Sequence, residues 1–280
     1  MRGWHCRARD KSVESKMTML PLSRWLAEAR RALIGVFTDI DDTLTTEGAI
    51  TDDALQALHD LKAAGLHVVA ITGRPVGWST PFAAAWPVDA IVPENGAVAL
   101  LPSAGGALDK RYQHDAETRA ANFARMQQVL ARIEREIAGA RRATDSSGRE
   151  CDIAIDHSEF THLSDTQIDA VVRLMRSEGM HASVSSIHIN GWYGEHNKLE
   201  GARWIVRELR QRDLDAEMNR WAYVGDSTND QRMFEAFDNS IGVANIARFV
   251  PQLLHLPGYV TAGERGAGFA EVARAILSAR

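Results

Sequence analysis

The chain alternates between short, continuous apolar runs and segments whose apolar residues recur at helical spacing. Residues 32–39 form the first run, and residues 51–65 then place Leu55, Leu58 and Leu61 on one helical face. Further apolar runs lie at 66–73, 88–96, 220–227 and 239–245, and another helical segment lies at 198–211. Apolar runs that alternate with helices are typical of a parallel sheet covered by helices on both faces. The pattern predicts an α/β fold with a doubly wound parallel sheet.

The segment between these runs has an organisation of its own. Helical periodicity at 117–139 and 164–179 is followed each time by alternating residues, at 150–156 and 182–190. In the first alternating segment Cys151, Ile153 and Ile155 share a face. In the second, Ile187 and Ile189 are expected to pack on the helices. We therefore expect an inserted α/β cap domain over 97–194, and a catalytic core over 31–96 and 195–280.

The first 30 residues are expected to form an extension that is partly disordered. Residues 1–17 are basic and polar without the apolar stretch of a secretory signal, and Met17 and Met19 are alternative starts. Residues 22–32 carry Leu22, Trp25 and Leu26 at the spacing of a short amphipathic helix.

Composition and charge exclude several classes of protein. The 280 residues are 45% hydrophobic and 25% charged, as in ordinary globular proteins, and no stretch approaches the ~20 apolar residues of a membrane span. The net charge of -5 offers no basic field for nucleic acid. Two cysteines are too few for a disulfide framework, so the cytoplasm is the expected location.

The acidic cluster after the first run is the strongest candidate for chemistry. Asp39, Asp41 and Asp42 stand within four positions, where each carboxylate makes ionising the next more costly unless a cation lies between them. A polar turn is the plain alternative. A calcium loop does not fit, because Leu44 and Ile50 occupy the places of its glycine and glutamate. As a catalytic motif, Asp39 would attack a phosphoryl group and Asp41 would transfer a proton to the leaving oxygen.

Polar residues also stand where other predicted strands or helices begin or end. Thr72 and Gly73 follow a strand and suit a phosphate, although a plain turn before Pro75 explains them equally well. Lys198 opens a helix, where a lone lysine is usually solvated. The loop after 220–225 carries oxygen ligands suited to Mg²⁺ on Asp226, Asn229 and Asp230.

These four motifs, in this order, resemble those of the haloacid dehalogenase superfamily of phosphatases, over nearly all of the chain after residue 32. The insertion resembles the α/β cap of its subfamily IIB, which includes sucrose, trehalose and mannosyl-phosphoglycerate phosphatases. The resemblance implies that Asp39 is the nucleophile, Asp41 the general acid and base, and Thr72 and Lys198 the phosphate holders. Asp42 departs from the usual glycine or asparagine and is expected to turn away from the metal.

The assigned roles form two sets beyond catalysis. The metal set is Asp39, Asp41, Asp226, Asn229 and Asp230. The substrate set is Thr72, Gly73, Arg74, Asn95, Ser186, His188, Asn190 and Lys198. Within it, Ser186, His188 and Asn190 are placed by strand alternation, which turns them away from the cap helices toward the bound substrate.

The expected activity is Mg²⁺-dependent hydrolysis of a small phosphorylated metabolite, a sugar phosphate, through an aspartyl-phosphate on Asp39. A phosphomutase that uses the same aspartyl-phosphate is the main alternative. A phospho-accepting signalling module is a further one, but it needs neither the cap nor the Asp39/Asp41 pair. No nucleic acid or membrane partner is expected.

Overall fold

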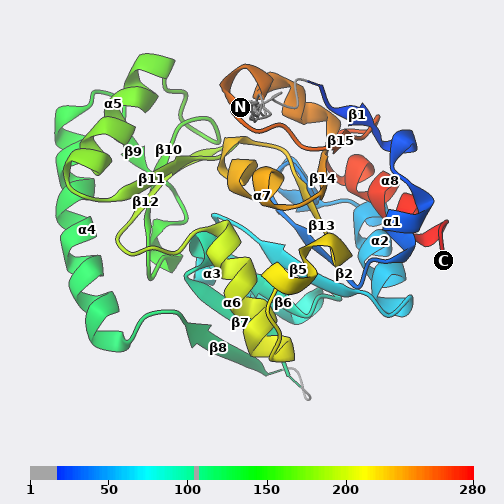
Figure 1. Ribbon diagram of the computed structural model, residues 1–280. Helices are drawn as coiled ribbons and strands as arrows, with labels where there is room; N and C mark the ends of the chain where they lie inside the picture. The colour runs from blue at the N-terminus through cyan, green and yellow to red at the C-terminus, as the bar shows by residue number, and fades with distance from the viewer. Residues whose placement is uncertain (1–17, 104–106) are drawn as a thin grey trace, which may run out of the picture.

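The computed structural model describes residues 18–103 and 107–280, so the interpretation of 1–17, including Cys6, lies outside the described residues. Its helices and strands form two lobes, each built around a sheet of its own (Figure 1). The larger lobe holds nine strands in the order β1-β15-β14-β13-β2-β5-β6-β7-β8, and the smaller lobe holds β11-β12-β10-β9. A two-stranded hairpin of β3 (Thr45–Thr46) and β4 (Ala49–Ile50) follows the acidic cluster.

The large sheet is parallel from β1 to β6, which confirms the predicted doubly wound α/β core. Its five predicted strands are β2 (Gly35–Thr38), β5 (His67–Ile71), β6 (Ala90–Val92), β13 (Trp221–Gly225) and β14 (Asn239–Gly242). Its other strands are β1 (Leu20–Pro21), β7 (Val98–Pro102), β8 (Leu108–Tyr112) and β15 (Tyr259–Val260). β7 and β8 pair antiparallel and close one edge.

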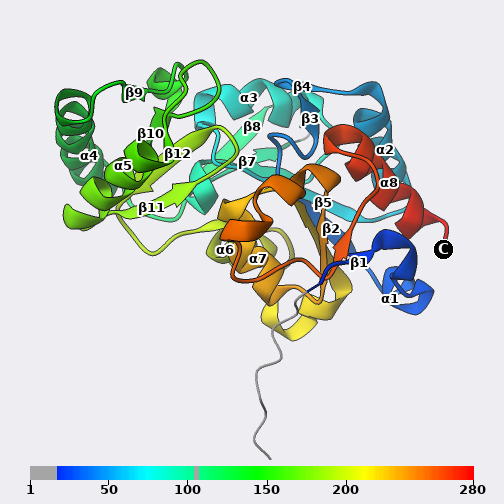
Figure 2. The ribbon, with the colours of Figure 1, turned by 90° about the horizontal axis from the view of Figure 1, so that it is seen from above.

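Helices cover both faces of this sheet (Figure 2). On one face lie α2 (Asp52–Ala63), α3 (Val76–Ala85) and α8 (Arg265–Leu277), and on the other α6 (Lys198–Arg210) and α7 (Gln231–Ala236). Successive β2 residues divide between the two cores, because strand side chains alternate: Val36 joins the first and Phe37 the second.

The N-terminal segment belongs to the core from residue 20 onward, so the predicted extension reaches too far. β1 pairs with β15, and the indole Nε1 of Trp25 donates to Oδ1 of Asn239 at 3.0 Å. The expected single helix is a short 3₁₀ turn, Leu22–Arg24, followed by α1 (Ala27–Arg31). Leu26 has extended backbone angles between them, so its side chain is exposed rather than packed beside Trp25.

The smaller lobe, called the cap below, has an antiparallel sheet with two helices on one face, and the larger lobe is called the core. The strands of the cap are β9 (Arg141–Arg142), β10 (Ile153–Asp156), β11 (His181–Val184) and β12 (His188–Trp192), and its helices are α4 (Ala116–Glu136) and α5 (Asp165–Ser177). Ile153, Ile155 and Ile189 pack with the helices, as their alternation predicts, whereas Ile187 lies in the turn before β12 and outside this cluster. Cys151 does not, because it precedes β10 and packs with the large core instead.

Two details of the inserted segment differ from the prediction. Residues 98–102 and 108–112 extend the large sheet as β7 and β8, although they fall inside the predicted 97–194 cap. The single strand expected at 182–190 is the hairpin β11–β12, with residues 185–187 as its turn. Oγ of Ser185 accepts from the backbone N–H of His188 at 3.0 Å, and this bond stabilises the turn.

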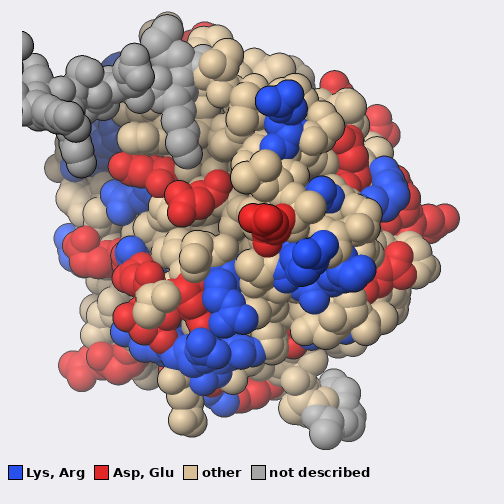
Figure 3. Space-filling view, turned by 45° about the vertical axis from the view of Figure 1, so that its right-hand side comes forward, with Lys and Arg blue, Asp and Glu red and all other residues tan. Residues whose placement is uncertain are grey.

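Acidic and basic side chains intermingle on the face shown in Figure 3, as expected for a chain without a single-sign field. Within the described residues, none of the helices has the length and apolar character needed to cross a bilayer.

Candidate active site

The site lies where three neighbouring parallel strands end. β13, β2 and β5 are adjacent in the sheet, and Asp226, Asp39 and Thr72 follow them directly. The carboxyl ends of parallel strands share one edge, so residues far apart in sequence meet there. All three side chains are buried.

Asp39 and Lys198 form a buried ion pair at the centre. Nζ of Lys198 lies 2.9 Å from Oδ1 of Asp39 and donates to Oδ1 of Asp230 at 2.7 Å. Burial raises the pKa of Asp39 to about 7, against the opposing effect of Lys198. Burial alone would lower the pKa of Lys198, but the carboxylates of Asp230 and Asp39 outweigh it and raise that pKa. Lys198 is thus a charged group inside the site rather than the solvated side chain of the plain interpretation.

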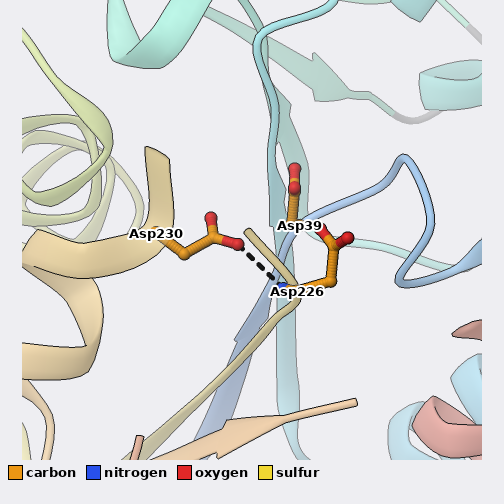
Figure 4. A group of neighbouring side chains, drawn as sticks. All are labelled: Asp39, Asp226 and Asp230. Atoms are coloured by element: carbon orange, nitrogen blue, oxygen red, sulfur yellow. Dashed lines mark hydrogen bonds between the residues drawn. The ribbon is translucent and has the colours of Figure 1, made fainter. Parts of the chain in front are cut away.

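Three carboxylates converge beside this pair. Ligand atoms of Asp39, Asp226 and Asp230 lie within 4.8 Å of one another, and Figure 4 shows their side chains gathered where β2 and β13 end. Burial, followed by the charges of Asp230 and Asp39, raises the pKa of Asp226 well above its ordinary value. Oδ1 of Asp226 is buried and has no hydrogen-bond partner among the described residues. Such an oxygen fits a bound cation, because an unpaired buried acceptor is otherwise costly.

The loop residues Asn229 and Asp230 are placed differently from Asp226. Oδ2 of Asp230 accepts the backbone N–H groups of Asp226 (2.9 Å) and Ser227 (3.1 Å), and its Oδ1 also accepts from the hydroxyl of Tyr223. Four donors therefore surround this one carboxylate. Oδ1 of Asn229 accepts from Oγ of Ser227 at 2.9 Å, at the rim of a groove described below.

The Asp41 carboxylate is not part of the three-carboxylate cluster. Both of its oxygens accept from Nε of Arg74, at 3.0 and 3.1 Å. Arg74 in turn reaches across to the cap, where it pairs with Asp145 at 3.3 Å and with Glu159 at 2.8 Å. Among the described residues, Arg74 is thus held by protein carboxylates on both sides of the site.

The loop after β5 brings Thr72, Gly73 and Asn95 together. Oγ1 of Thr72 accepts from the N–H of Arg74 at 3.0 Å, so its own hydroxyl proton stays available as a donor. The N–H of Asn95 donates to the carbonyl of Thr72 at 2.9 Å. A Cβ on Gly73 would lie 3.1 Å from Oδ1 of Asn190, so glycine permits this close approach of the cap.

The polar face of β12 points to the core, but its predicted residues bond to protein groups. Nδ2 of Asn190 donates to the carbonyl of Gly73 at 3.2 Å, and Nε2 of His188 donates to Oε2 of Glu159 at 3.0 Å. The carbonyl of Ser186 accepts from Oγ of Ser158 at 2.7 Å. All three predicted residues are buried. Asn190 therefore contacts the core and His188 is not a solvated strand residue, whereas Ser186 lies in the β11–β12 turn rather than on the strand that the alternation predicts; their role toward a substrate stays a prediction.

A buried polar cluster joins cap and core, and the sequence analysis did not predict it. Oε2 of Glu94 accepts the N–H groups of Glu150 and Asp152, each at 3.1 Å, and also that of Cys151. Arg149 donates to Asp152 at 2.7 Å and to the carbonyl of Gly73 at 3.0 Å. The only signal was the charge-rich stretch at 149–152 within an otherwise buried strand region.

Asn245 was missed as well, although it ends a predicted strand. Its Nδ2 donates to Oδ2 of Asp226 at 3.1 Å and to the backbone carbonyl of Asp42 at 3.0 Å. The Asp42 carboxylate pairs with Arg248 at 2.8 Å and Arg265 at 3.1 Å, outside the three-carboxylate cluster. Asn245 therefore fixes one oxygen of Asp226 and leaves the other free.

A groove of about 990 Å³ lies between cap and core and reaches Lys198 at its inner side. Its inner wall includes Lys198, Asn95 and Asn229, and its cap wall includes His157 and Ser158. The cap rests on the core beside it, since Oγ1 of Thr228 donates to the carbonyl of Val184 at 2.6 Å. The volume suits a small polar molecule.

Comparisons with known proteins agree with this arrangement. Residues 36–135 match the family of haloacid dehalogenase-like hydrolases. A 42-residue segment is 55% identical to a candidate phosphatase of Streptococcus pyogenes, and it spans 15% of this chain and 16% of that protein.

Solved structures align over most of the chain. The Thermoplasma acidophilum protein 0175 aligns with 88% of this chain and 99% of its own, at 16% identity and a TM-score of 0.67. The sucrose-phosphatase of Synechocystis aligns with 88% of this chain and 98% of its own, at 17% identity and a TM-score of 0.61. The subclass IIB sugar phosphatase BT4131 aligns with 87% of this chain and 98% of its own, at 14% identity and a TM-score of 0.59. Residues 36–135 are thus similar to the haloacid dehalogenase-like hydrolases, and the solved structures show that the chain as a whole shares the fold of these proteins.

Proposed function

We propose that the protein is a Mg²⁺-dependent phosphomonoester hydrolase that acts on a small phosphorylated metabolite, a sugar phosphate, through an aspartyl-phosphate on Asp39. One observation carries the proposal. Asp39 is buried against Lys198 and beside Asp226, whose free oxygen has no hydrogen-bond partner among the described residues. Buried negative charge of this kind suits a cation and an incoming phosphate group.

In this proposal Asp39 and Asp226 hold the metal ion. Asp230 was predicted as a ligand too, but four donors already surround it, so we assign it to bracing the loop and Lys198. Asn229 is assigned to the groove side of the metal loop, and Asp41 to proton transfer. Bound there, Mg²⁺ would offset the charge of the carboxylates and of the phosphoryl group.

The chain's own groups then have distinct roles. A carboxylate oxygen of Asp39 forms the bond to phosphorus as the bond to the leaving oxygen breaks, while Lys198 favours the ionised form of that carboxylate and stabilises charge on the phosphoryl oxygens. The hydroxyl of Thr72 donates to the phosphoryl group. Asp41 gives a proton to the leaving oxygen and later takes one from the attacking water, and Arg74 orients its carboxylate.

The sugar-phosphate assignment is supported by the groove and by the relatives. Two solved structures that share this fold are named as sugar phosphatases. One is the sucrose-phosphatase of Synechocystis, and the other is BT4131. The polar lining of the groove offers partners for hydroxyl groups. His188 was predicted to contact the leaving group directly, and we now assign its effect to Glu159, to which it donates. The cytoplasmic location stays a prediction.

A phosphate-release screen tests the function. Purified protein is assayed with Mg²⁺ against p-nitrophenyl phosphate and a panel of sugar phosphates, beside the Asp39→Asn variant. We expect free phosphate from wild type alone, because the amide is nearly isosteric but a poor nucleophile. Turnover by a folded Asp39→Asn variant would contradict the covalent mechanism. Conversion of a sugar phosphate to its isomer without free phosphate would indicate the phosphomutase.

A further inference from the structure

The cap loop after β10 holds a carboxylate, Glu159, directly over the catalytic side of the site. Both carboxylate oxygens of Asp156 organise this loop by accepting four backbone N–H groups, those of residues 158–161, at 2.9 to 3.1 Å. The loop conformation is therefore fixed by the protein itself. Glu159 does not depend on a ligand to take its position.

The side chain of Glu159 is held as an ionised group with limited access to solvent. It accepts from Nη2 of Arg74 at 2.8 Å and from Nε2 of His188 at 3.0 Å, and it is 19% exposed. Burial acts to raise its pKa, but the hydrogen bonds from His188 and Arg74 outweigh burial and bring the pKa to about 2. Its charge is thus constant over any working pH.

A single guanidinium separates Glu159 from Asp41, the group assigned to the leaving oxygen. Arg74 donates from Nε to Asp41 and from Nη2 to Glu159, so the two carboxylates lie on one Arg74 side chain. A leaving group that contacts Asp41 would have Arg74, and beyond it Glu159, as its next charged neighbours toward the cap. Oε2 of Glu159 already accepts from His188 and from Nη1 of Arg74, whereas Oε1 accepts from Nη2 of Arg74 alone and has a second lone pair with which it can accept from such a group.

The charges around Arg74 do not balance. Three carboxylates, those of Asp41, Asp145 and Glu159, contact this one guanidinium, which leaves two negative charges in excess. The neighbouring Arg149 also contacts Asp145, at 3.0 Å, but it pairs with the buried Asp152 at 2.7 Å as well, so four carboxylates share two guanidinium groups and the excess of two negative charges remains. The opposite end of the site, at Lys198, receives the phosphoryl group. The cap side of the site therefore carries an excess of negative charge of its own, at a distance from the group of carboxylates around Lys198.

We propose that Glu159 is a specificity-determining residue, which accepts a hydrogen bond from a hydroxyl or ammonium group of the leaving group and rejects leaving groups that carry a carboxylate. The substrate class is then phosphates of neutral or amino sugars and polyols, rather than phosphates of sugar acids. This inference rests on the proposed phosphatase function and adds the charge of the substrate to it. A negative group brought near two uncompensated carboxylates is repelled in a poorly solvated site.

The test compares matched substrates on purified full-length enzyme with Mg²⁺. Glucose 6-phosphate, glucosamine 6-phosphate and 6-phosphogluconate are measured as substrates. Where turnover is undetectable, they are measured as competitive inhibitors of p-nitrophenyl phosphate hydrolysis. We expect wild type to favour either neutral or amino compound over the acid by tenfold or more in kcat/KM or in inhibition constant. No preference in wild type would overturn the inference.

Variants then assign the preference to Glu159. Glu159→Gln is expected to reduce the preference at least fivefold, and Glu159→Asp, which keeps the charge, to retain most of it. Glu136→Gln, on the outer side of α4 where Glu136 pairs with Arg132, is the matched control and should leave the preference unchanged. A Glu159→Gln effect equal on all three compounds would make Glu159 a structural ion-pair partner and overturn the proposal. Absent p-nitrophenyl phosphate hydrolysis in wild type would instead contradict the proposed function.

Discussion

His196 makes the stability of the protein depend on pH in a way that can be calculated. It lies between β12 and α6, on one of the connections between cap and core, and is only 3% exposed. Its ring stacks on Trp192 at 5.5 Å between centroids and lies 5.8 Å from that of His114. Neither ring nitrogen has a hydrogen-bond partner among the described residues. Burial, followed by the nearby His114 and His181, lowers the pKa of His196 to about 3.

The sign of the effect follows from proton linkage. The unfolded chain binds a proton at His196 below about pH 6.5, whereas the folded protein does so only near pH 3, so acid favours the unfolded state. The contribution is complete above pH 6.5 and is lost progressively as the pH falls from 6.5 to about 3. Within this range each unit by which the pH falls lowers the free energy of unfolding by ~1.4 kcal/mol. At pH 5.0, which is 1.5 units below the unfolded value, the loss is about 2 kcal/mol.

His196→Phe isolates this contribution, because phenylalanine keeps the ring beside Trp192 and cannot be protonated. The free energy of unfolding is measured by urea denaturation with tryptophan fluorescence, at pH 7.5 and 5.0, for wild type and variant. We expect the variant to gain about 2 kcal/mol relative to wild type on going from pH 7.5 to 5.0. His255→Phe, at an exposed histidine, is the control for removing an imidazole in general. A His196→Phe difference that is the same at both pH values, within about 0.5 kcal/mol, would refute the reasoning.

Three further predictions follow from the site and the core. Asp226→Ala should weaken Mg²⁺ binding at least tenfold in isothermal titration calorimetry, because it removes the unpaired buried oxygen; unchanged affinity would exclude Asp226 as a ligand. Gly73→Ala should lower stability by about 1 to 3 kcal/mol and reduce kcat/KM, because its Cβ would crowd Asn190 at the catalytic loop; wild-type values for both would show that the cap yields easily. Trp25→Ala should lower the free energy of unfolding by about 3 to 5 kcal/mol in urea denaturation, because the indole is buried in the core. A loss below 1 kcal/mol would indicate that the N-terminal segment does not stabilise the core.

The buried polar cluster between cap and core has a consequence for how the two lobes behave. Glu94, Arg149 and Asp152 lie almost entirely out of solvent and bond mainly to one another and to backbone groups of both lobes. Separating the lobes would expose these bonds to water, and removing one partner would leave a buried charge unpaired. The cluster therefore favours this single arrangement of the cap, with Gly73 pressed against Asn190.

The sequence by itself determined the core fold and the centre of the site. Apolar runs interrupted by helical periodicity identify strands of a parallel sheet, because such strands are buried on both faces and need no distant partner to be recognised. Asp39, Thr72 and Asp226 could then be brought together, since the carboxyl ends of neighbouring parallel strands share one edge. The order of the motifs also identified Lys198 as a candidate, but only the structure shows that it is buried and paired with Asp39.

Tertiary structure alone decided which charges meet across the site. Arg74 and Glu159 are 85 positions apart, and neither periodicity nor a local motif pairs a core guanidinium with a carboxylate on a cap loop. Likewise, residues 98–102 and 108–112 join the large sheet because its open edge strand offers them hydrogen bonds, which depends on the assembled sheet rather than on those residues. The local sequence pattern determines which helices and strands form. The pairing of buried charges depends on how those elements pack, because packing decides which charged side chains become neighbours.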